Sequence, residues 1–341
     1  MPGLKASLGR SSLEPGDRVL FILLRAMGDV LLATPIIRAF KEVFPDVLID
    51  VLAEPIPAQT LRHNPDIERV IKSPKRGSGP AEYIPLIREL RVRRYRAAID
   101  ALSTPGSALL TRLTGSPIRI GYDLPRRRRL YTHPIAAAKE AVYAPMAKRR
   151  LLSAFGLEAE STANASSILP KVYPGRPEEA EAKKVIERAG GDGRLILGLA
   201  PFCRREWKQW KIPYWRETLE RLNDLNAVWL LFAAGAERPA LEELESAKNM
   251  SIQWVGAEDL LVAAAAMRMT KALIGGDNGL LHVAVAAGVP TFTVFAGRDD
   301  PKRWVPPSSP DHIYIDFRER RDDPKTPNEC ESAVRRLLGQ D

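Results

Sequence analysis

Asp29 is the first residue of the chain whose type and position suit chemistry. It ends the polar turn 24–29, which follows the apolar run 19–24. An unbroken apolar run is typical of a strand buried on both faces of a parallel sheet, and apolar residues at helical spacing continue over 29–44. Pro35 in the second turn predicts a kinked start to this helix. At the passage from strand to helix, Asp29 either caps the helix or takes part in a reaction, and position alone favours the cap.

A basic loop, 201–210, is the second candidate. It follows a predicted strand, 195–200, and precedes a predicted helix, 214–225. Cations at a helix entrance attract phosphate. A solvated basic loop anchored by Trp210 is the alternative, and the sequence supports both equally. The cations are Arg204, Arg205, Lys208 and Lys211.

The third candidate is the block 275–282, Gly-Gly-Asp-Asn-Gly-Leu-Leu-His. It leads from a predicted strand, 272–275, into a predicted helix, 280–287. Free N–H groups at the helix start would suit a pyrophosphate, and the glycines permit close backbone approach. A capped turn is the alternative, but two glycines around an Asp-Asn pair favour a ligand. We expect His282 to be structural.

Two acidic features are weaker. Glu237 follows the predicted strand 227–233, and a carboxylate at the end of a strand can hold ribose hydroxyls. Asp299 and Asp300 would suit a metal, but no spaced histidine or second carboxylate cluster accompanies them, so a surface loop is favoured and no metal site is predicted. The two cysteines, Cys203 and Cys330, are expected to be free thiols in a reducing cytosol.

The elements that position these residues alternate between short strands and helices through all 341 residues. Such alternation predicts α/β structure with two doubly wound parallel sheets. The segment 160–177, rich in Ser and Pro, is the best boundary, which gives domains 1–170 and 171–341. Ligands of such folds bind at the carboxyl ends of strands, so we expect a site in the cleft between facing domains. The last helix, 328–338, has no strand partner and is a candidate to pack back on the first domain.

Charge is distributed unevenly between these domains. Residues 1–170 carry 26 Lys+Arg and 16 Asp+Glu, whereas residues 171–341 carry 25 and 26, within a formal net charge of +9. A basic half favours nucleic acid, an anionic membrane surface or an acidic small substrate as partner, although a merely solvated basic surface is equally consistent. No apolar run approaches the roughly 20 residues of a membrane span, and residues 1–17 do not form a secretory signal, so a cytoplasmic location is expected.

In order along the chain, these segments resemble glycosyltransferase family 9, the heptosyltransferase family of lipopolysaccharide core assembly. The resemblance lies in Gly28-Asp29-Val30 with Thr34-Pro35, in Lys208-Gln209-Trp210, and in the block 276–282 followed by Gly288-Val289-Pro290. It implies a GT-B fold, in which two Rossmann-like domains face each other across a cleft. The N-terminal domain would bind the acceptor and the C-terminal domain the nucleotide sugar.

The resemblance also implies an activity and residue roles. The chain would be an inverting transferase of heptose or a related sugar, moving it from an ADP-sugar-like donor to a lipopolysaccharide-core or other acidic glycolipid acceptor without metal or other cofactor. Asp29 matches the catalytic base and Lys208 the diphosphate-binding lysine. Glu237 matches the ribose-binding carboxylate less securely. The matching donor block is Asp277, Asn278, Gly279 and Leu280.

The basic half fits an acidic, lipid-linked acceptor at the cytoplasmic face of an anionic membrane, with the protein bound peripherally at the inner membrane. The residues expected to contact the acceptor, on weaker grounds, are Arg25, Arg126, Arg127, Arg128 and Arg129. The four-arginine run is also consistent with a solvated surface.

Departures from the family pattern leave the sugar open. Residues 202–205 (Phe-Cys-Arg-Arg) replace glycine and hydroxyl residues, Asn278 replaces a commoner Thr, and residues 296–298 replace a Gly-Pro-Thr turn. Another nucleotide sugar or acceptor is therefore an alternative. A GT-B-like sugar-nucleotide epimerase and a nucleic-acid-binding protein are further alternatives, although no known nucleic-acid-binding module is evident.

Overall fold

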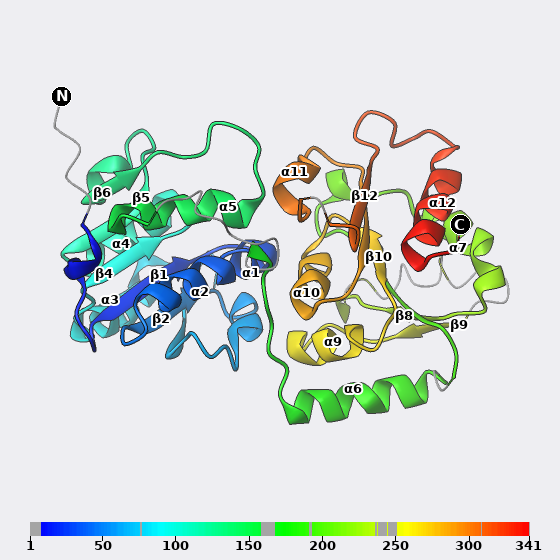
Figure 1. The fold of residues 1–341 in the computed structure, drawn as a ribbon, viewed down its shortest axis with the longest axis horizontal. Helices are drawn as coiled ribbons and strands as arrows, with labels where there is room; N and C mark the ends of the chain where they lie inside the picture. The colour runs from blue at the N-terminus through cyan, green and yellow to red at the C-terminus, as the bar shows by residue number, and fades with distance from the viewer. Residues whose placement is uncertain are drawn as a thin grey trace. The chain divides into compact units, whose positions relative to one another are not determined.

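Two six-stranded sheets form the cores of two compact units, Met1–Pro170 and Lys171–Asp341. The structure is a computed structural model, and it describes residues 8–75, 77–157, 168–190, 193–235, 237, 244, 251–307 and 309–340. Each unit is described by itself, and Figure 1 shows helices flanking both sheets. Residues 160–167 of the expected boundary segment 160–177 lie outside the described residues.

The first sheet has the strand order β3-β2-β1-β4-β5-β6, and every pairing is parallel. This is the order of a Rossmann sheet, in which the direction of winding reverses between β1 and β4. The strands are β1 (Arg18–Leu23), β2 (Leu48–Ala53), β3 (Arg69–Lys72), β4 (Ala97–Asp100), β5 (Ile118–Tyr122) and β6 (His133–Ile135).

Helices cover both faces of this sheet because β1 is apolar on both sides. Val19, Phe21 and Leu23 of β1 pack in one core cluster with residues of α2, whereas Leu20 and Ile22 pack with residues of α3 and α4. The α-helices of the unit are α1 (Met27–Leu31), α2 (Thr34–Val43), α3 (Tyr83–Val92), α4 (Pro105–Leu113) and α5 (Ala144–Arg149). The 3₁₀ turns are η1 (Arg10–Ser12), η2 (Pro57–Leu61), η3 (Pro80–Glu82), η4 (Arg128–Leu130) and η5 (Arg150–Phe155).

The single helix expected over 29–44 is two helices, α1 and α2. Pro35 has no N–H to donate to the carbonyl of Leu31, and its ring would crowd that group, so the first helix ends there. The hydroxyl of Thr34 donates to the Leu31 carbonyl oxygen instead, at 2.8 Å. The break leaves α1 as a helix of five residues directly after β1.

The second sheet repeats the same topology. Its order is β12-β11-β10-β7-β8-β9, again with every pairing parallel, so the winding reverses between β7 and β10. The strands are β7 (Ile196–Ala200), β8 (Val228–Leu231), β9 (Ser251–Trp254), β10 (Leu273–Gly276), β11 (Thr291–Phe295) and β12 (His312–Asp316). The expectation of two doubly wound α/β sheets is confirmed.

Helices also flank the second sheet on both sides. On one side Trp215 and Leu219 of α7 share a core cluster with Ala333 and Val334 of α12, and on the other α6, α9 and α10 pack in sequence (Figure 1). The α-helices are α6 (Arg176–Arg188), α7 (Ile212–Arg221), α9 (Leu260–Met267), α10 (Gly279–Ala287), α11 (Pro301–Trp304) and α12 (Thr326–Leu338). The 3₁₀ turns include η7 (Glu206–Lys208) and η8 (Asn223–Leu225).

The last helix has strand partners that the sequence did not reveal. α12 packs on α7 and on β11 and β12 of the second unit. Along β12, His312 is buried and the residues after it alternate between partly buried and exposed, which suits an edge strand and gives a weak apolar signal. Among the described helices, none has the length and apolarity that a membrane crossing requires.

Candidate active site

Asp29 lies at the point where the first sheet reverses its winding. It is in the first turn of α1, which follows β1, and the neighbouring strand β4 ends at Asp100. Doubly wound sheets bind ligands at this switch point, at the carboxyl ends of the strands. The topology therefore places Asp29 where a ligand of the first unit is expected.

Asp29 does not cap the helix. The N-cap residue is Ala26, and it makes no side-chain capping bond. The carboxylate instead faces two cations: Oδ2 lies 3.4 Å from Nε of Arg25 and Oδ1 lies 3.9 Å from Nζ of Lys148. Its side chain is 12% exposed, so the carboxylate remains accessible between these cations. The cap favoured from position alone is therefore wrong.

Lys148 is a buried cation of this site that the sequence did not single out. It comes from α5, which packs on α2. Burial lowers the pKa of its ammonium, against the opposing attraction of Asp29. The signal in the sequence was slight, because a lysine beside Arg149 and Arg150 is typical of a solvated basic run.

The arginine run 126–129 divides into two kinds of residue. Arg127 donates to the carbonyl oxygen of Ser103 at 2.8 Å, and Arg128 pairs with Asp123 at 3.3 Å. Arg126 and Arg129 are exposed. Because this loop follows β5, it lies at the carboxyl ends of the strands, as Asp29 does. Arg127 and Arg128 thus have partners within the first unit, although Arg128 is exposed like Arg126 and Arg129.

A buried carboxylate supports this sheet edge. Asp100, fully buried at the end of β4, accepts hydrogen bonds from the N–H groups of Leu102 and Ser103 and from the Tyr131 hydroxyl, at 3.1, 2.8 and 2.8 Å. Burial raises the pKa of Asp100, although the bonds from Ser103 and Tyr131 oppose that shift. Since Ser103 in turn accepts from Arg127, Asp100 fixes the base of the arginine loop.

In the second unit, Asn278 ties together the two loops that flank the switch point. Its amide nitrogen donates to the carbonyl oxygens of Ala200, the last residue of β7, and Phe202, at 2.8 and 3.1 Å. Its oxygen accepts from the N–H groups of Leu280 and Leu281, at 2.9 and 3.3 Å, as the N-cap of α10. The expectation of free N–H groups at this helix start is therefore wrong for these two residues.

Lys208 lies at the centre of a charged cluster between these loops. Its ammonium is 2.7 Å from Oδ2 of Asp277 and also contacts the carboxylate of Asp299. It lies over the rings of Trp207 and Trp304, 5.4 and 5.9 Å from their centroids. Burial alone would lower the pKa of Lys208, but the two carboxylates outweigh it and the pKa is raised. For Asp277, burial raises the pKa of the carboxyl, and the charge of Lys208 opposes that shift.

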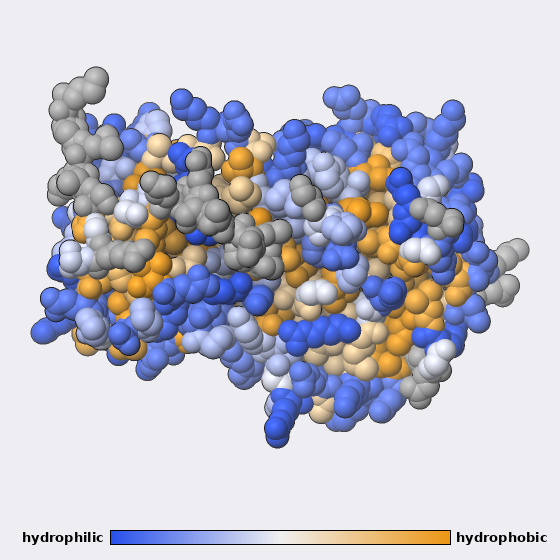
Figure 2. All heavy atoms as spheres, viewed as in Figure 1, coloured by the Kyte–Doolittle hydropathy of each residue, from blue (hydrophilic) through white to orange (hydrophobic). Residues whose placement is uncertain are grey.

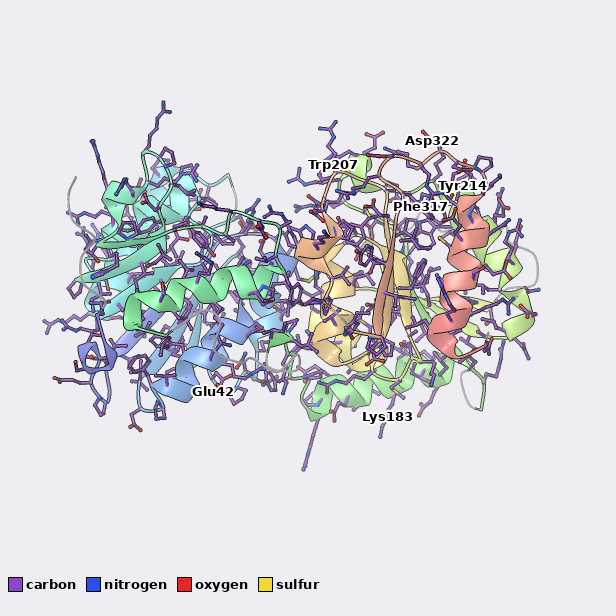
Figure 3. The ribbon with its side chains drawn as sticks, turned by 45° about the horizontal axis from the view of Figure 1, so that its top comes forward. Glu42, Lys183, Trp207, Tyr214, Phe317 and Asp322 are labelled. Atoms are coloured by element: carbon purple, nitrogen blue, oxygen red, sulfur yellow. The ribbon has the colours of Figure 1, made fainter. Side chains whose placement is uncertain are left out.

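The other cations of the loop 201–211 do not join this cluster. Arg204 and Arg205 are exposed. Lys211 pairs with Asp322 at 2.8 Å, close to Tyr214, whose hydroxyl donates to the Asp322 carbonyl (Figure 3). Of the four cations at the predicted helix entrance, Lys208 is thus the one brought to Asp277. Trp210 is buried against Trp215, so the expected packing anchor is also present.

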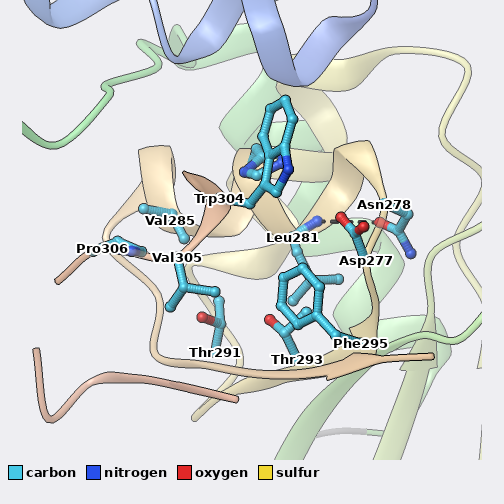
Figure 4. Close-up of a pocket in the computed structure, with 11 residues that line it drawn as sticks. Asp277, Asn278, Leu281, Val285, Thr291, Thr293, Phe295, Trp304, Val305 and Pro306 are labelled. Atoms are coloured by element: carbon cyan, nitrogen blue, oxygen red, sulfur yellow. Dashed lines mark hydrogen bonds between the residues drawn. The ribbon is translucent and has the colours of Figure 1, made fainter. Parts of the chain in front are cut away.

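A pocket opens beside the cluster within the second unit (Figure 4). Asp277 and Asn278 form part of its wall, together with Trp304 of α11. His282, which we expected to be structural, also lines it and lies against Trp304 with ring centroids 5.7 Å apart. The carboxyl ends of β10 and β11 therefore border a hollow with an acidic group at its wall.

Glu237 lies after β8, on the other side of β7 from this block. Its carboxylate accepts from the N–H of Ala234 at 2.8 Å, and burial raises its pKa while that bond opposes the shift. Among the described residues, no ion pair or hydrogen bond joins Glu237 to the Lys208 cluster, so the structure does not bring these candidates into direct contact.

Asp299 is the residue of this site that sequence reasoning set aside. The surface-loop interpretation holds for Asp300, which caps α11 by accepting from the N–H of Lys302 at 3.0 Å, but not for Asp299, which contacts Lys208. Only the tertiary fold brings residues 208 and 299 together. Within the described ranges, no three His, Cys, Asp or Glu side chains are grouped so that they could hold a metal ion.

The amino-acid sequence is similar to those of known glycosyltransferases. Residues 84–332, more than half of the chain, match the family model described as glycosyltransferase family 9 (heptosyltransferase). Lipopolysaccharide heptosyltransferase 2 of Escherichia coli strain K12 is 26% identical over 296 residues, which cover 84% of this chain and 81% of that protein.

Two solved structures are similar in fold. A family 9 glycosyl transferase from Veillonella parvula superposes with a TM-score of 0.81 at 19% identity, covering 97% of this chain and 100% of that one. An E. coli heptosyltransferase with ADP-2-deoxy-2-fluoro heptose gives a TM-score of 0.73 at 23% identity, covering 95% and 99%. These matches favour a glycosyltransferase over the epimerase and nucleic-acid-binding alternatives. With two Rossmann-like units of the GT-B fold, the chain belongs to glycosyltransferase family 9, the heptosyltransferases.

Proposed function

We propose that the protein transfers heptose, or a closely related sugar, from an ADP-sugar-like donor to a lipopolysaccharide-core or other acidic glycolipid acceptor. The observation that carries the proposal is the placement of both candidate centres, Asp29 and the Lys208–Asp277 pair, at the switch points of their sheets in a family 9 chain. The first unit, 1–170, binds the acceptor, and the second, 171–341, binds the nucleotide sugar.

Asp29 acts as the general base of an inverting displacement. Its carboxylate takes the proton of the acceptor hydroxyl as that oxygen attacks the anomeric carbon of the donor. The bond from that carbon to the diphosphate oxygen breaks on the opposite face, and the nucleoside diphosphate leaves with the electron pair. A positioned base contributes roughly 10²–10⁴-fold to such a step.

The second unit stabilises the leaving diphosphate. Lys208 places a positive charge where negative charge develops, so that no metal or other cofactor is required. Asp277, Gly279 and Leu280 bind the donor, and Asn278 holds their turn in place through its four hydrogen bonds. Glu237 binds ribose hydroxyls from the end of β8.

The acceptor reaches the first unit from an anionic membrane surface. Arg25, with the exposed Arg126 and Arg129, lies at the same sheet edge as Asp29 and recognises phosphates and carboxylates of the acceptor. We infer a cytoplasmic protein that binds peripherally at the inner membrane, because its first half carries the whole positive excess.

One experiment tests the proposal directly. Calorimetric titration with ADP-, UDP-, GDP- and dTDP-sugars identifies the donor class, and the transfer product with the preferred donor is then analysed for its anomeric configuration. We expect preference for an ADP-sugar and inversion at the anomeric carbon. Preference for another base would redirect the donor assignment, and retention would remove Asp29 from its role as base.

A further inference from the structure

Lys208 faces more negative charge than it can neutralise. One ammonium contacts two carboxylates, those of Asp277 and Asp299, so the cluster carries an excess of one negative charge. The rings of Trp207 and Trp304 lie close to the same ammonium and limit the access of water. A half-buried site of this kind is a poor place for the further negative charges of a diphosphate.

The carboxylates of Asp277 and Asp299 differ in how easily they can move away from Lys208. The side chain of Asp277 is 5% exposed, and its residue lies between β10 and the capped start of α10. The side chain of Asp299 is 30% exposed and belongs to the loop between β11 and α11. Asp299 can therefore rotate into water, whereas Asp277 cannot without disturbing the turn.

The backbone of the Asp299 loop is held against the turn that carries Lys208. A Cβ added at Gly297 would lie 3.0 Å from the Trp207 ring and 3.1 Å from Cα of Lys208. On its other side, Asp300 caps α11. The loop is thus fixed at both flanks, and the carboxylate of Asp299 is held near Lys208 whenever no other anion is there.

We propose that Asp299 is an internal counter-ion that occupies Lys208 in the free protein and is displaced by the diphosphate of the donor. The inference rests on the proposed role of Lys208 in binding that diphosphate. Displacement separates Asp299 from its cation, so it weakens the binding of every ligand that needs Lys208. After transfer, the return of Asp299 to Lys208 favours departure of the nucleoside diphosphate.

The test compares two variants with the same change of charge at neighbouring positions. Asp299→Asn removes the charge that competes with the ligand. Asp300→Asn removes one negative charge at the next position, and its asparagine caps a helix equally well. Calorimetry measures the binding of inorganic pyrophosphate, which is independent of the nucleotide base, and of ADP. Because one close charge is removed, we expect Asp299→Asn to bind both ligands about tenfold more tightly and Asp300→Asn to bind them like the parent protein.

Each other outcome has a defined meaning. Unchanged or weaker binding by Asp299→Asn would overturn the counter-ion role, and so would an equal gain in Asp300→Asn, which would indicate a general effect of net charge. Lys208→Met, measured with the same ligands, shows whether Lys208 binds the diphosphate at all. It therefore distinguishes a failure of the counter-ion role of Asp299 from a failure of the proposed role of Lys208. If Lys208→Met binds pyrophosphate as tightly as the parent protein, Lys208 is not the diphosphate site, and the inference falls with it.

Discussion

The carboxylate of Asp29 lies between two cations, and its proposed role gives a clear expectation for its amide variant. Asp29→Asn keeps the size of the side chain but cannot accept the proton of the acceptor hydroxyl. We expect turnover to fall at least about a hundredfold, the lower range for loss of a general base. ADP affinity should not change, because the donor binds to the second unit. Steady-state kinetics and calorimetry measure these two quantities.

A carboxylate at the amino ends of the strands of the same sheet, opposite to the end where Asp29 lies, provides the control. Glu68 immediately precedes β3, at the amino ends of the strands, and it is exposed. Glu68→Gln should leave both turnover and ADP affinity unchanged. Normal turnover in a folded Asp29→Asn protein would remove the base assignment, and an equal loss in Glu68→Gln would point to an effect of net charge.

Single residues show how far the sequence could identify the site. Lys208 and Asp277 could be proposed from their loops, because loops at the carboxyl ends of parallel strands carry ligands. The partner Asp299 could not, since 91 positions separate it from Lys208 and its own neighbour Asp300 is an ordinary helix cap. Asn278 was correctly placed in the block, but its two hydrogen bonds to the carbonyl oxygens of Ala200 and Phe202 follow from the packing of β7 beside β10.

At the scale of elements, close contact between β10 and β7 depends on a missing side chain. A Cβ at Gly275 would lie 2.3 Å from the carbonyl oxygen of Ala200, whereas one at Gly276 would meet the sulfur of Cys203 at 2.8 Å. A backbone carbonyl in a sheet cannot yield as a cysteine side chain can. We expect Gly275→Ala to lower the free energy of unfolding by about 2–3 kcal/mol and Gly276→Ala by about 1 kcal/mol.

The measurement can be confined to the affected unit. All six tryptophans lie beyond residue 170, so tryptophan fluorescence during urea unfolding reports the second unit alone. The double variant Gly276→Ala with Cys203→Ala serves as the comparison, because removing the sulfur should relieve the Gly276→Ala clash. A Gly275→Ala protein as stable as the parent would contradict the tight approach of these strands.

The buried Asp100 at the end of β4 gives a pH-dependent prediction. Burial raises its pKa in the folded state, so folding favours the protonated carboxyl, and its contribution to stability is lost as the pH rises above the ordinary range of an aspartate. Asp100→Asn can still accept from the N–H groups of Leu102 and Ser103 but has no charge to bury. Its melting temperature should therefore exceed that of the parent at pH 7, by a margin that shrinks toward pH 4.

Scanning calorimetry of the two proteins across that range measures the margin. Asp100→Ala is the comparison: it leaves the two N–H groups and the Tyr131 hydroxyl without their acceptor, and each such loss costs about 1–3 kcal/mol. It should be less stable than the parent at every pH. A constant difference between Asp100→Asn and the parent from pH 4 to pH 7 would show that Asp100 does not titrate differently on folding.

Elements were predictable where the apolar pattern was strong and were missed where it was weak. The inner strands β1 and β7 read as unbroken apolar runs because helices cover both of their faces. The edge strand β6 is three residues long and contains Pro134, which a sheet tolerates only at its edge, and β12 is half exposed. The break between α1 and α2 was expected only as a kink within one helix. The sequence around Pro35 does not show whether the helix continues through the proline or ends and starts again.

The whole molecule contains two units that have the same topology but different net charge. The first carries ten more cations than anions, whereas the second is nearly neutral. Hydrophilic side chains make up most of the outer rim of each unit on the face seen in Figure 2. Strand order and charge are independent properties, so two units with one fold can take ligands of different chemistry. This asymmetry was readable from the sequence, because it depends on composition rather than on packing.

That asymmetry predicts how the acceptor is recognised. Arg126 and Arg129 are exposed, whereas Arg127 and the equally exposed Arg128 contact Ser103 and Asp123. The double variant Arg126→Glu with Arg129→Glu should raise the apparent Michaelis constant for an anionic lipid-linked acceptor several-fold at low salt, with ADP affinity unchanged. The effect should fade near 0.5 M salt, where the Debye length is only about 4 Å.

The matched control places the same charge change in the second unit. Lys183 of α6 (Figure 3) and Arg336 of α12 are exposed cations, and Lys183→Glu with Arg336→Glu alters the net charge of the protein by the same amount. Acceptor kinetics of this control should match those of the parent, because the proposed acceptor contacts belong to the first unit and not to the second. If both double variants change the Michaelis constant equally, overall charge attracts the acceptor and the arginine loop has no part in its recognition. If neither does, the run is solvated surface and acceptor binding depends on residues closer to Asp29, of which Arg25 is the first to test.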